Sequence, residues 1–586
     1  MEEFNTSIRW NLNNLLYGLD IEKFNNYLVS IKVSLIEIEE YSKTSTMDDV
    51  VLKMISQTIK KIESAESFYY CLTTEDITAS VLSSLNGTIS VLKSQVRIII
   101  SNLQSNLNGM NEKQLTDWSS NISEKNFLEE LLKDVKKPRK EEKLISNLVS
   151  ETLNGLEDLY GQVRNNLKVK VDSDFEAKEV SFAEASNLSV SHPDQYKRHY
   201  IFRELNKTLE EEGNIFASIY NQMVGIRINE NKIRGVDYLH NSLKLNGISK
   251  PTLDVMWSVV DDNINELSNY LRIKAEEIGK EKISWHELMT SSSEVSLEIN
   301  FFQAIDGIIN SLENIDENMC EFVKEAIRKR WIDAEQRKNK PYGGFCAPFI
   351  SEGESRISLN YDNSIDSARR LAHELGHAWH FKQLKDNPSL YFLDDTFEMT
   401  MAETSSIFFE IAFVDHVIQN TKDISIKKSL LGTKIERSLN YLMSIRGAFL
   451  FENRFYEERK IRPLNAKQIE ELSLHFQDKA YGGSLSEYEP FVWIKYGQFY
   501  QANTPFYNYP YSFGFLLSIG LLEIAKKDGG FKQKFKDFLS ETGMLPLEQL
   551  IQKHFHIELS YADFWQQSVQ RLIQDIEQYK QMKYFT

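Results

Sequence analysis

Cysteine is scarce in this chain of 586 residues, and the three that occur, Cys71, Cys320 and Cys346, lie far apart. A small, odd number of widely spaced cysteines argues against a disulfide framework. Residues 1–4 begin with acidic side chains and contain neither a basic segment nor an apolar one, so we expect no signal peptide. These absences together predict a cytoplasmic protein.

The lack of a long apolar run and the shortage of basic residues restrict the possible partners of the protein. No apolar run approaches the roughly 20 residues needed to cross a bilayer, so we expect no membrane association. The 68 basic residues are outnumbered by 85 acidic ones, which gives a net charge of -17 at pH 7. Because phosphate binding needs a basic surface, nucleic acid is not an expected partner. The residue pattern predicts no particular oligomeric state.

The most informative motif is His373-Glu374-Leu375-Gly376-His377, which has the pattern H-E-x-x-H. On a helix, this spacing places two imidazoles one turn apart, where both can bind a single metal ion. Glu374 lies between them and can reach a water molecule beside that ion, which is the position of a general base. The motif therefore predicts two metal ligands, His373 and His377, and a catalytic base, Glu374.

The residues around the motif support a helix. Apolar side chains recur at steps of three and four, and a possible capping residue, Asn363 or Ser364, precedes them. The apolar positions are Ile365, Ala368, Ala372, Leu375 and Trp379. In an alternative interpretation, the two histidines are hydrogen-bonded core residues, but that interpretation must also explain Glu374 beside them.

A catalytic zinc site needs a third protein ligand and an open coordination position. The metzincin pattern H-E-x-x-H-x-x-G-x-x-H does not fit, because His380 stands at its glycine position and Gln383 at its last histidine position. A glutamate on a second helix is the other common solution. The segment 401–410 supplies one after a turn-rich loop, and we predict Glu403 as the third ligand.

With these residues in place, the sequence resembles the thimet oligopeptidase and oligoendopeptidase F family of zinc peptidases, and oligoendopeptidase F most. The resemblance rests on five blocks, at residues 342–349, 373–380, 402–406, 480–483 and 506–514. The blocks follow one another over roughly residues 195–560. Together they are far more specific than the H-E-x-x-H motif alone.

The resemblance implies a mainly α-helical fold, in which two helical lobes enclose a deep channel and a small β-sheet lies beside the metal-binding helix. We place an amino-terminal helical lobe at 1–194 and a catalytic lobe at 195–586, because His192-Pro193-Asp194 interrupts the chain. Amphipathic stripes at 24–38 and 89–107 predict helices in the first lobe, the second starting just after Gly87 and Thr88.

The same resemblance implies the chemistry. The three ligands hold one zinc ion per chain, and Glu374 serves as the base in the hydrolysis of internal peptide bonds. Two tyrosines of the carboxy-terminal aromatic block, Tyr507 and Tyr511, match positions implicated in oxyanion stabilisation and substrate binding. Family members of this shape act on short, unfolded peptides, because a buried site excludes folded proteins.

One position departs from the family pattern. Related enzymes usually have a histidine at the start of the His-Phe-Tyr element ahead of the aromatic block, and this chain has Gln498 there. Glutamine donates a neutral hydrogen bond but cannot titrate or carry a positive charge. We expect Gln498 to contact the substrate, with weaker transition-state stabilisation or an altered peptide preference.

A hairpin precedes the metal-binding helix. Residues 344–350 and 356–360 are typical of two short strands joined by the turn-prone residues 351–354. In zinc peptidases a strand beside the metal helix can pair with the backbone of an extended substrate. We therefore expect Gly344 and Phe345 to bind substrate, and we interpret Cys346 as a buried small side chain and not as a reactive thiol.

Two residues after Glu403 are candidates for supporting the ligands. Glu410 lies two turns later on the same helical face and could orient a ligand histidine through its second ring nitrogen. Ser406, one turn after Glu403, is the competing candidate. We interpret His380 as a packing or supporting residue, because a fourth protein ligand would close the open position.

Two other functions compete with a zinc endo-oligopeptidase. A helical zinc carboxypeptidase also has H-E-x-x-H and a later glutamate. Such an enzyme needs a side chain that binds the terminal carboxylate of its substrate, and no local motif in this sequence indicates one. A peptide-binding relative without activity is favoured only by Gln498, and the retention of Glu374 argues against it.

Overall fold

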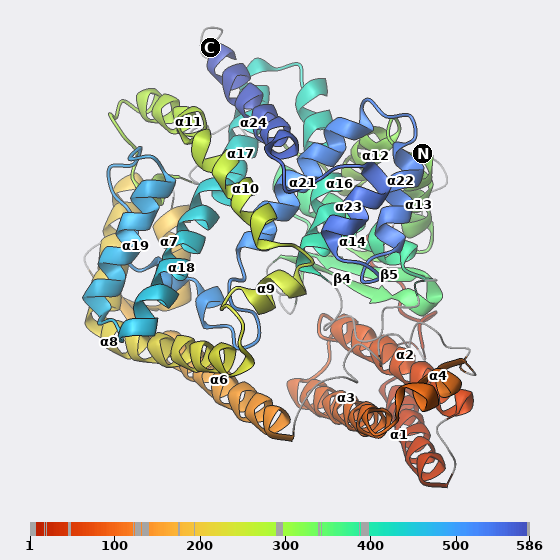
Figure 1. The fold of residues 1–586 in the computed structure, drawn as a ribbon. Coiled ribbons are helices and arrows are strands. Elements are labelled where there is room, and N and C mark those ends of the chain that lie inside the picture. The colour runs from red at the N-terminus through yellow and green to blue at the C-terminus, as the bar shows by residue number, and fades with distance from the viewer. Residues whose placement is uncertain are drawn as a thin grey trace. The chain divides into compact units, whose positions relative to one another are not determined.

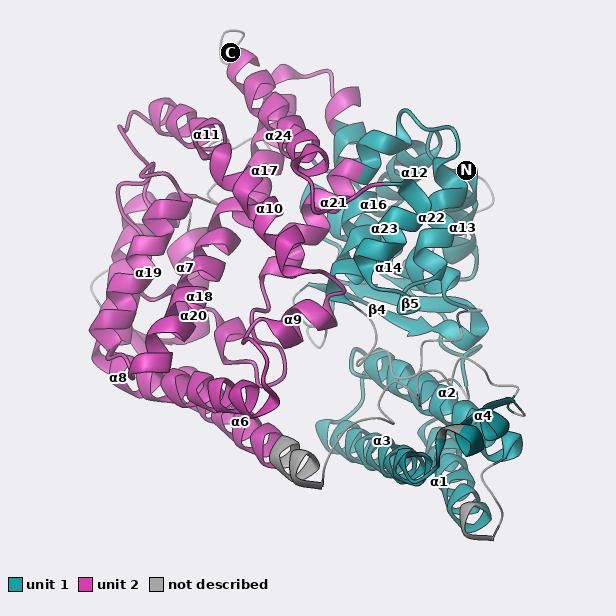
Figure 2. Cartoon of the chain, in the orientation of Figure 1, with its two compact units in different colours: residues 1–139, 297–417, 521–556 teal, residues 140–296, 418–520, 557–586 magenta. Residues whose placement is uncertain are grey.

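The computed structural model describes residues 7–16, 18, 20–44, 48–120, 122, 131, 140–173, 176–192, 194–288, 297–337, 340, 343–385, 387 and 398–582. The chain forms two compact units, each assembled from three segments (Figure 2). Unit 1 comprises residues 1–139, 297–417 and 521–556, and unit 2 comprises 140–296, 418–520 and 557–586. The predicted lobes, 1–194 and 195–586, divide the chain at a single point, and that division stays a prediction.

Both units are mostly helical (Figure 1). Unit 1 contains α1 (Ile21–Thr44), α2 (Asp49–Leu72), α3 (Ala79–Asn108), α4 (Glu112–Ser120), α12 (Phe301–Leu312), α13 (Glu317–Arg328), β3 (Ile332–Asp333), β4 (Gly344–Phe349), the 3₁₀ turn η2 (Ile350–Glu352), β5 (Glu354–Leu359), α14 (Ile365–Gln383), most of α16 (Met399–Asn420), α22 (Phe531–Ser540) and α23 (Leu547–Phe555). The two strands flanking η2 form the predicted hairpin.

Unit 2 is also mostly helical. It contains α6 (Lys140–Asn166), β1 (Lys168–Ser173), β2 (Glu176–Ser181), α7 (Phe182–Ser191), α8 (Gln195–Arg234), α9 (His240–Leu245), α10 (Lys250–Asp262), α11 (Ile264–Glu277), the 3₁₀ turn η1 (Trp285–Glu287), α17 (Ile424–Leu439), the π-helical turn η3 (Asn440–Ser444), α18 (Ile445–Ile461), α19 (Ala466–Ala480), α20 (Val492–Lys495), the 3₁₀ turn η4 (Gly497–Tyr500), most of α21 (Tyr509–Ala525) and α24 (Ala562–Met582). Strands β1 and β2 form an antiparallel hairpin.

The predicted mainly α-helical fold with small sheets is confirmed. Both amphipathic stripes of the first half lie on helices, α1 and α3, and their apolar residues are buried. Helix α3 begins at Ala79 and not after Thr88, so Gly87 lies inside it, with open space where a Cβ would be. Among the described residues, no helix is both long enough and apolar enough to span a bilayer.

The three-stranded sheet of unit 1 has the order β3-β5-β4. Strand β4 runs antiparallel to β5, with Gly344 opposite Leu359, and β3 runs parallel to β5. Within the part of the chain that the structure describes, β4 pairs with β5 alone, so its other edge carries no strand partner. That free edge is available to an added strand.

The core of unit 1 joins its amino-terminal helices to this sheet. Ala347 and Phe349 of β4 are buried in the same apolar cluster as the core residues of α1, α2 and α3. Phe345 packs against the cluster, and its ring meets Trp10 edge-on at 6.3 Å between ring centroids. Because side chains alternate along a strand, Gly344 and Cys346 belong to the opposite face of β4.

Candidate functional site

Helix α14 carries the H-E-x-x-H motif and packs against both β4 and β5. It begins where the sequence predicted, because the Ser364 side chain caps it by accepting a hydrogen bond from the Ser367 backbone N–H. Four of the five predicted apolar positions, Ala368, Ala372, Leu375 and Trp379, are buried. Burial of this stripe turns the histidines to one side of the helix.

The predicted metal ligands converge. One ligand atom from each of His373, His377 and Glu403 lies within 4.8 Å of the others. The two imidazole rings stand nearly perpendicular, 4.8 Å apart between centroids, and His373 Nε2 lies 3.5 Å from Glu403 Oε2. Two imidazoles and one carboxylate form a donor set that suits zinc, so the residues fit a zinc ion.

A close helix crossing brings Glu403 to the histidines. A Cβ built on Gly376 of α14 would lie 2.6 Å from both the Ser405 carbonyl oxygen and the Ser406 Cα of α16. The Ser405 hydroxyl also donates to the Gly376 carbonyl at 2.9 Å. Only glycine allows two helix backbones to approach this closely.

A second layer of polar groups contacts the ligands. The Nδ1–H of His373 donates to Glu410 Oε2 at 3.1 Å, and Arg369 Nη1 lies 2.9 Å from the same oxygen. The Ser406 hydroxyl donates to Glu403 Oε2 at 3.0 Å. The two residues that competed for one supporting role therefore contact different ligands, Glu410 a histidine and Ser406 the carboxylate.

The surroundings shift the pKa values of His373, His377 and Glu374 in different directions. Burial disfavours the charged form of His373, but the hydrogen bond to Glu410 and the charge of Glu403 outweigh it and raise the pKa of His373 to about 9. Burial lowers the pKa of His377 well below its ordinary value, with the charge of His373 adding to the effect. Burial raises the pKa of Glu374 to about 7, although His373 opposes this shift. The two imidazoles therefore differ, because the surroundings of His373 favour a protonated ring and those of His377 favour a neutral one.

The predicted substrate strand lies against the predicted base. A Cβ on Gly344 would lie 3.0 Å from Glu374 Oε1 and 3.2 Å from the Ser358 carbonyl oxygen, so Glu374 passes directly beside the strand. The Phe345 side chain lies on the other face, among the amino-terminal helices. Its contact with an extended peptide would therefore be made by its backbone.

Three more predicted site residues belong to unit 2. Tyr507 precedes α21 and Tyr511 lies in its first turn, and their hydroxyl oxygens are 2.9 Å apart. Gln498 lies in η4 and is partly buried. The structure thus joins the two tyrosines to each other, and it joins the ligands, Glu374, Glu410, Ser406 and Gly344 to one another within unit 1.

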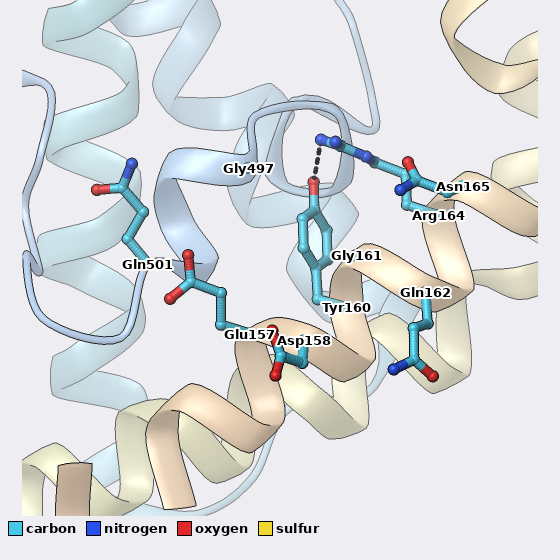
Figure 3. A pocket seen from close by; sticks show the side chains of 9 residues that line it. All are labelled: Glu157, Asp158, Tyr160, Gly161, Gln162, Arg164, Asn165, Gly497 and Gln501. Atoms are coloured by element: carbon cyan, nitrogen blue, oxygen red, sulfur yellow. Dashed lines mark hydrogen bonds between the residues drawn. The ribbon is translucent and has the colours of Figure 1, made fainter. Parts of the chain in front are cut away.

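A cavity of about 690 Å³ in unit 2 lies between α6 and the segment that contains η4 (Figure 3). Some of its polar side chains have hydrogen-bond partners. Arg164 donates to the Tyr160 hydroxyl at 3.0 Å, and Glu157 accepts from the Ala502 backbone N–H at 2.8 Å. Gly497 lines this cavity, but none of the predicted catalytic residues does.

Two residues near the motif, His380 and Cys346, pack against neighbouring side chains and are not among the ligands. His380 is fully buried, its Nε2 lies 2.8 Å from the Thr542 hydroxyl of unit 1, and burial lowers its pKa to about 3. Cys346 packs with Phe381 and Leu384 of this region, and burial raises the pKa of its thiol well above the ordinary value. The packed His380 agrees with the interpretation made from the sequence, whereas Cys346 is only partly buried and not fully buried as expected.

The sequence reasoning missed Arg369 and Ser405. Arg369 lies one helical turn before His373, a spacing that places both side chains on one face, and this signal could have identified it. Ser405 could not be found in this way, because its partner is a backbone oxygen of another helix.

Comparison with known proteins places the chain among peptidases. Residues 188–571 match peptidase family M3. The chain is 23% identical over 558 residues to an oligoendopeptidase F homolog of Borreliella burgdorferi, with 91% of this chain and 90% of the relative covered. It is 22% identical to the chromosomal oligoendopeptidase F of Lactococcus lactis subsp. cremoris, over 62% of this chain and 60% of the relative.

A solved structure has the same fold. The oligoendopeptidase F of Enterococcus faecium superimposes with a TM-score of 0.69 at 15% sequence identity, covering 96% of this chain and 99% of that one.

Proposed function

The chain belongs to peptidase family M3, and on that basis we propose that it is a zinc-dependent endo-oligopeptidase that cuts internal bonds of short, unfolded peptides. The observation that carries the proposal is the convergence of His373, His377 and Glu403 within 4.8 Å of one another, beside Glu374. A bound zinc ion would lower the pKa of a water molecule and polarise the scissile carbonyl.

The chain's own residues would supply the proton transfers. Glu374 would accept the proton of the attacking water and pass it to the departing amine. A pKa of about 7 suits a carboxylate that must both take and release a proton near neutral pH. The carboxylates of Glu410 and Glu403 raise the pKa of His373, so ion binding there would compete with a proton.

Substrate would be held in an extended conformation. The free edge of β4 at Gly344 lies beside Glu374, so a peptide added to that edge would present its backbone next to the base. Tyr507 and Tyr511 would donate hydrogen bonds to the carbonyl oxygen as negative charge develops there. This last role, and substrate contact by Gln498, rest on the resemblance to the family.

The proposal is tested with two substitutions that separate chemistry from metal binding. Glu374→Gln should keep its zinc, measured by elemental analysis, and lose turnover of a decapeptide by about a hundredfold to ten-thousandfold. Glu403→Gln should lose most of its zinc, because a ligand charge is removed. Glu471→Gln, the same change at an exposed position of unit 2, is the control and should alter neither quantity.

Two outcomes contradict these assignments. Substantial turnover in Glu374→Gln would remove it as the base, and full zinc content in Glu403→Gln would remove it as a ligand. A peptide blocked at both ends distinguishes the endopeptidase from a carboxypeptidase, because only the endopeptidase cuts it.

A further inference from the structure

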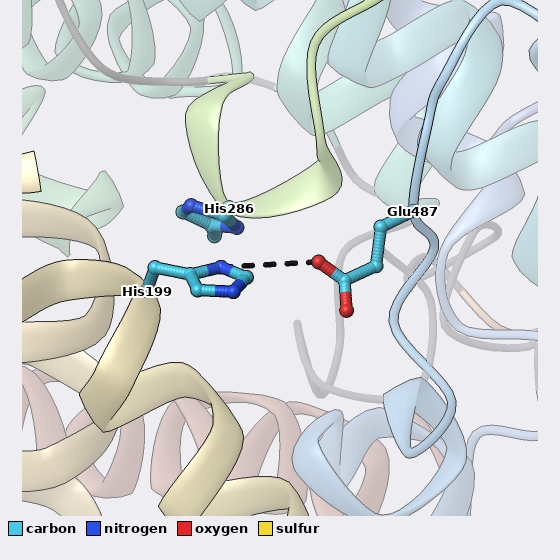
Figure 4. A group of neighbouring side chains, drawn as sticks. All are labelled: His199, His286 and Glu487. Carbon is cyan, nitrogen blue, oxygen red and sulfur yellow. Dashed lines mark ion pairs between the residues drawn. The ribbon is translucent and has the colours of Figure 1, made fainter. Parts of the chain in front are cut away.

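Unit 2 contains a second group of metal-ligating side chains, remote in sequence from α14. His199, His286 and Glu487 each offer one ligand atom, and these atoms lie within 4.8 Å of one another (Figure 4). We propose that this group, the His199 cluster, binds a divalent transition-metal ion of the zinc class. The proposal does not depend on peptidase activity, since none of the three residues has a part in the chemistry proposed above.

The fold fixes the backbones of two of the ligands against each other. Ser284 and Glu487 form a parallel β-bridge, and the Trp285 N–H donates to the Glu487 carbonyl oxygen at 2.9 Å. The Ser486 N–H donates to Ile283 at 2.9 Å on the other side of the bridge. His286, which follows this bridge in η1, and Glu487 are therefore held at a constant separation.

The third ligand is tied to the same loop. His199 lies in the second turn of α8, whose first residue, Gln195, donates from its side chain to Glu287 Oε1 at 2.5 Å. Lys280 donates to the same oxygen at 2.5 Å, and the Ser284 N–H donates to Glu287 Oε2 at 3.0 Å. Glu287 thus connects α8 to η1, which preorganises all three ligand positions.

The side-chain distances are close to those of an occupied site. His199 Nδ1 lies 3.9 Å from Glu487 Oε2, and the two imidazole centroids are 4.9 Å apart. Bonds of about 2.1 Å in a tetrahedral site place ligand atoms about 3.4 Å apart. The His199–Glu487 pair must therefore close by about 0.5 Å, and no ligand pair by more than about 1.4 Å, which a small side-chain rotation can supply.

The three ligands differ in burial: one is buried and two are half-exposed. His286 is 3% exposed, whereas the side chains of His199 and Glu487 are 42% and 34% exposed. Contacts with the Ser284 hydroxyl, 3.0 Å from Nδ1 and 3.4 Å from Nε2, hold the His286 ring. An ion could enter from the solvent side while the buried ring stays in place.

The chemistry of the donors selects the ion. Two imidazoles and one carboxylate suit zinc, cobalt or nickel, and they disfavour magnesium and calcium, which prefer all-oxygen sites. Glu287 is engaged by Gln195, Lys280 and Ser284, and it is not free to act as a base on a bound water. The site is therefore suited to holding an ion and not to catalysis.

Zinc titration of the full chain tests the proposal. Protein that already holds its tightly bound zinc should take up a second equivalent in equilibrium dialysis against excess zinc, with a rise in the thermal midpoint that increases with zinc concentration. His199→Ala, at a half-exposed position, should weaken the second equivalent by about tenfold or more. His475→Ala, an exposed histidine of unit 2 outside the cluster, is the control and should bind like the parent.

Cobalt gives a readout independent of activity. Glu403→Gln, which is expected to have lost the α14 site, should still bind one cobalt ion and develop its visible absorption, and adding His199→Ala should abolish it. A parent protein that stops at one ion in excess zinc would overturn the proposal. Equal uptake by His199→Ala and the parent would assign the second ion to another part of the acidic surface and would also overturn it.

Discussion

At the scale of single residues, the two nitrogens of His373 face different carboxylates. Nδ1 contacts Glu410 at 3.1 Å, and Nε2 lies 3.5 Å from Glu403. Arg369 Nη1 forms an ion pair with Glu410 Oε2 at 2.9 Å. A carboxylate on Nδ1 orients the ring and leaves Nε2 as the coordinating atom.

Glu410→Gln should therefore weaken metal binding while leaving the base in place. The substitution removes the charge that holds Nδ1–H, and we expect zinc affinity to fall by about 10- to 100-fold. Competition with a chelator measures this affinity. Turnover at saturating zinc should recover toward that of the parent, whereas Glu374→Gln should not recover. An unchanged affinity would mean that Glu410 serves only the ion pair with Arg369.

The residue types of the site could be predicted from the sequence, because H-E-x-x-H and a later glutamate are local signals. The contacts of the supporting residues could not. Ser406 and Glu410 were equivalent candidates on one helical face, and only the packing of α14 on α16 assigns each to a different ligand. The role of Gln498 at the substrate stays a prediction.

At the scale of secondary-structure elements, the sequence predicted the hairpin, α14 and its cap from periodicity and turn residues. It did not predict the order β3-β5-β4, because β3 has two residues and pairs with a strand more than twenty positions later. It also did not predict that α3 starts at Ala79, since the apolar stripe is denser in its second half.

The crossing of α14 and α16 leads to a prediction about Gly376. Gly376→Ala should push the helices apart, because its Cβ would lie 2.6 Å from two backbone atoms of α16. Separation moves Glu403 away from the histidines, so zinc content and turnover should fall together, and the thermal midpoint should drop.

Gly155→Ala is the matched control, since Gly155 lies within α6 with open space around it. Alanine there should be neutral or should stabilise the protein by about 0.5–1 kcal/mol. If both alanine variants behaved alike in zinc content and melting, the close crossing would not set the ligand geometry.

At the scale of the whole molecule, the interleaving of the units could not be predicted from local patterns. Periodicity reports which face of a segment is buried and not which distant segment covers it. Buried apolar residues between Trp10 and Leu131 pack with the sheet that precedes α14, and residues 140–194 belong to unit 2. A break such as His192-Pro193-Asp194 marks the end of an element, whereas the boundary of a unit is a property of the packing.

Global stability should depend on one buried acid of unit 2. Burial raises the pKa of Glu452 to about 7 from 4.5, although Arg227 and the Phe506 N–H oppose the shift. The folded state therefore holds a proton that the unfolded chain releases between these pH values. The stability contributed by this proton is full below pH 4.5 and is lost as the pH rises through about 7.

Glu452→Gln stays neutral and should lack this dependence. Relative to the parent, the variant should gain roughly 2 to 3 kcal/mol in the free energy of unfolding between about pH 5 and pH 8. Urea unfolding at both pH values measures the gain, with Glu471→Gln as the exposed control. A constant difference between variant and parent across this range would show that Glu452 is already ionised in the folded protein.

The three-segment construction of unit 1 also determines when the site can mature during synthesis. The ribosome releases residues 373, 377 and 403 long before 521–556, the last segment of unit 1. Until that segment emerges, His380 lacks the Thr542 hydroxyl and Phe408 lacks the rings of Phe531 and Phe535. While residues 404–520 are synthesised, the nascent chain must therefore carry its histidine motif on a helix whose packing is unfinished.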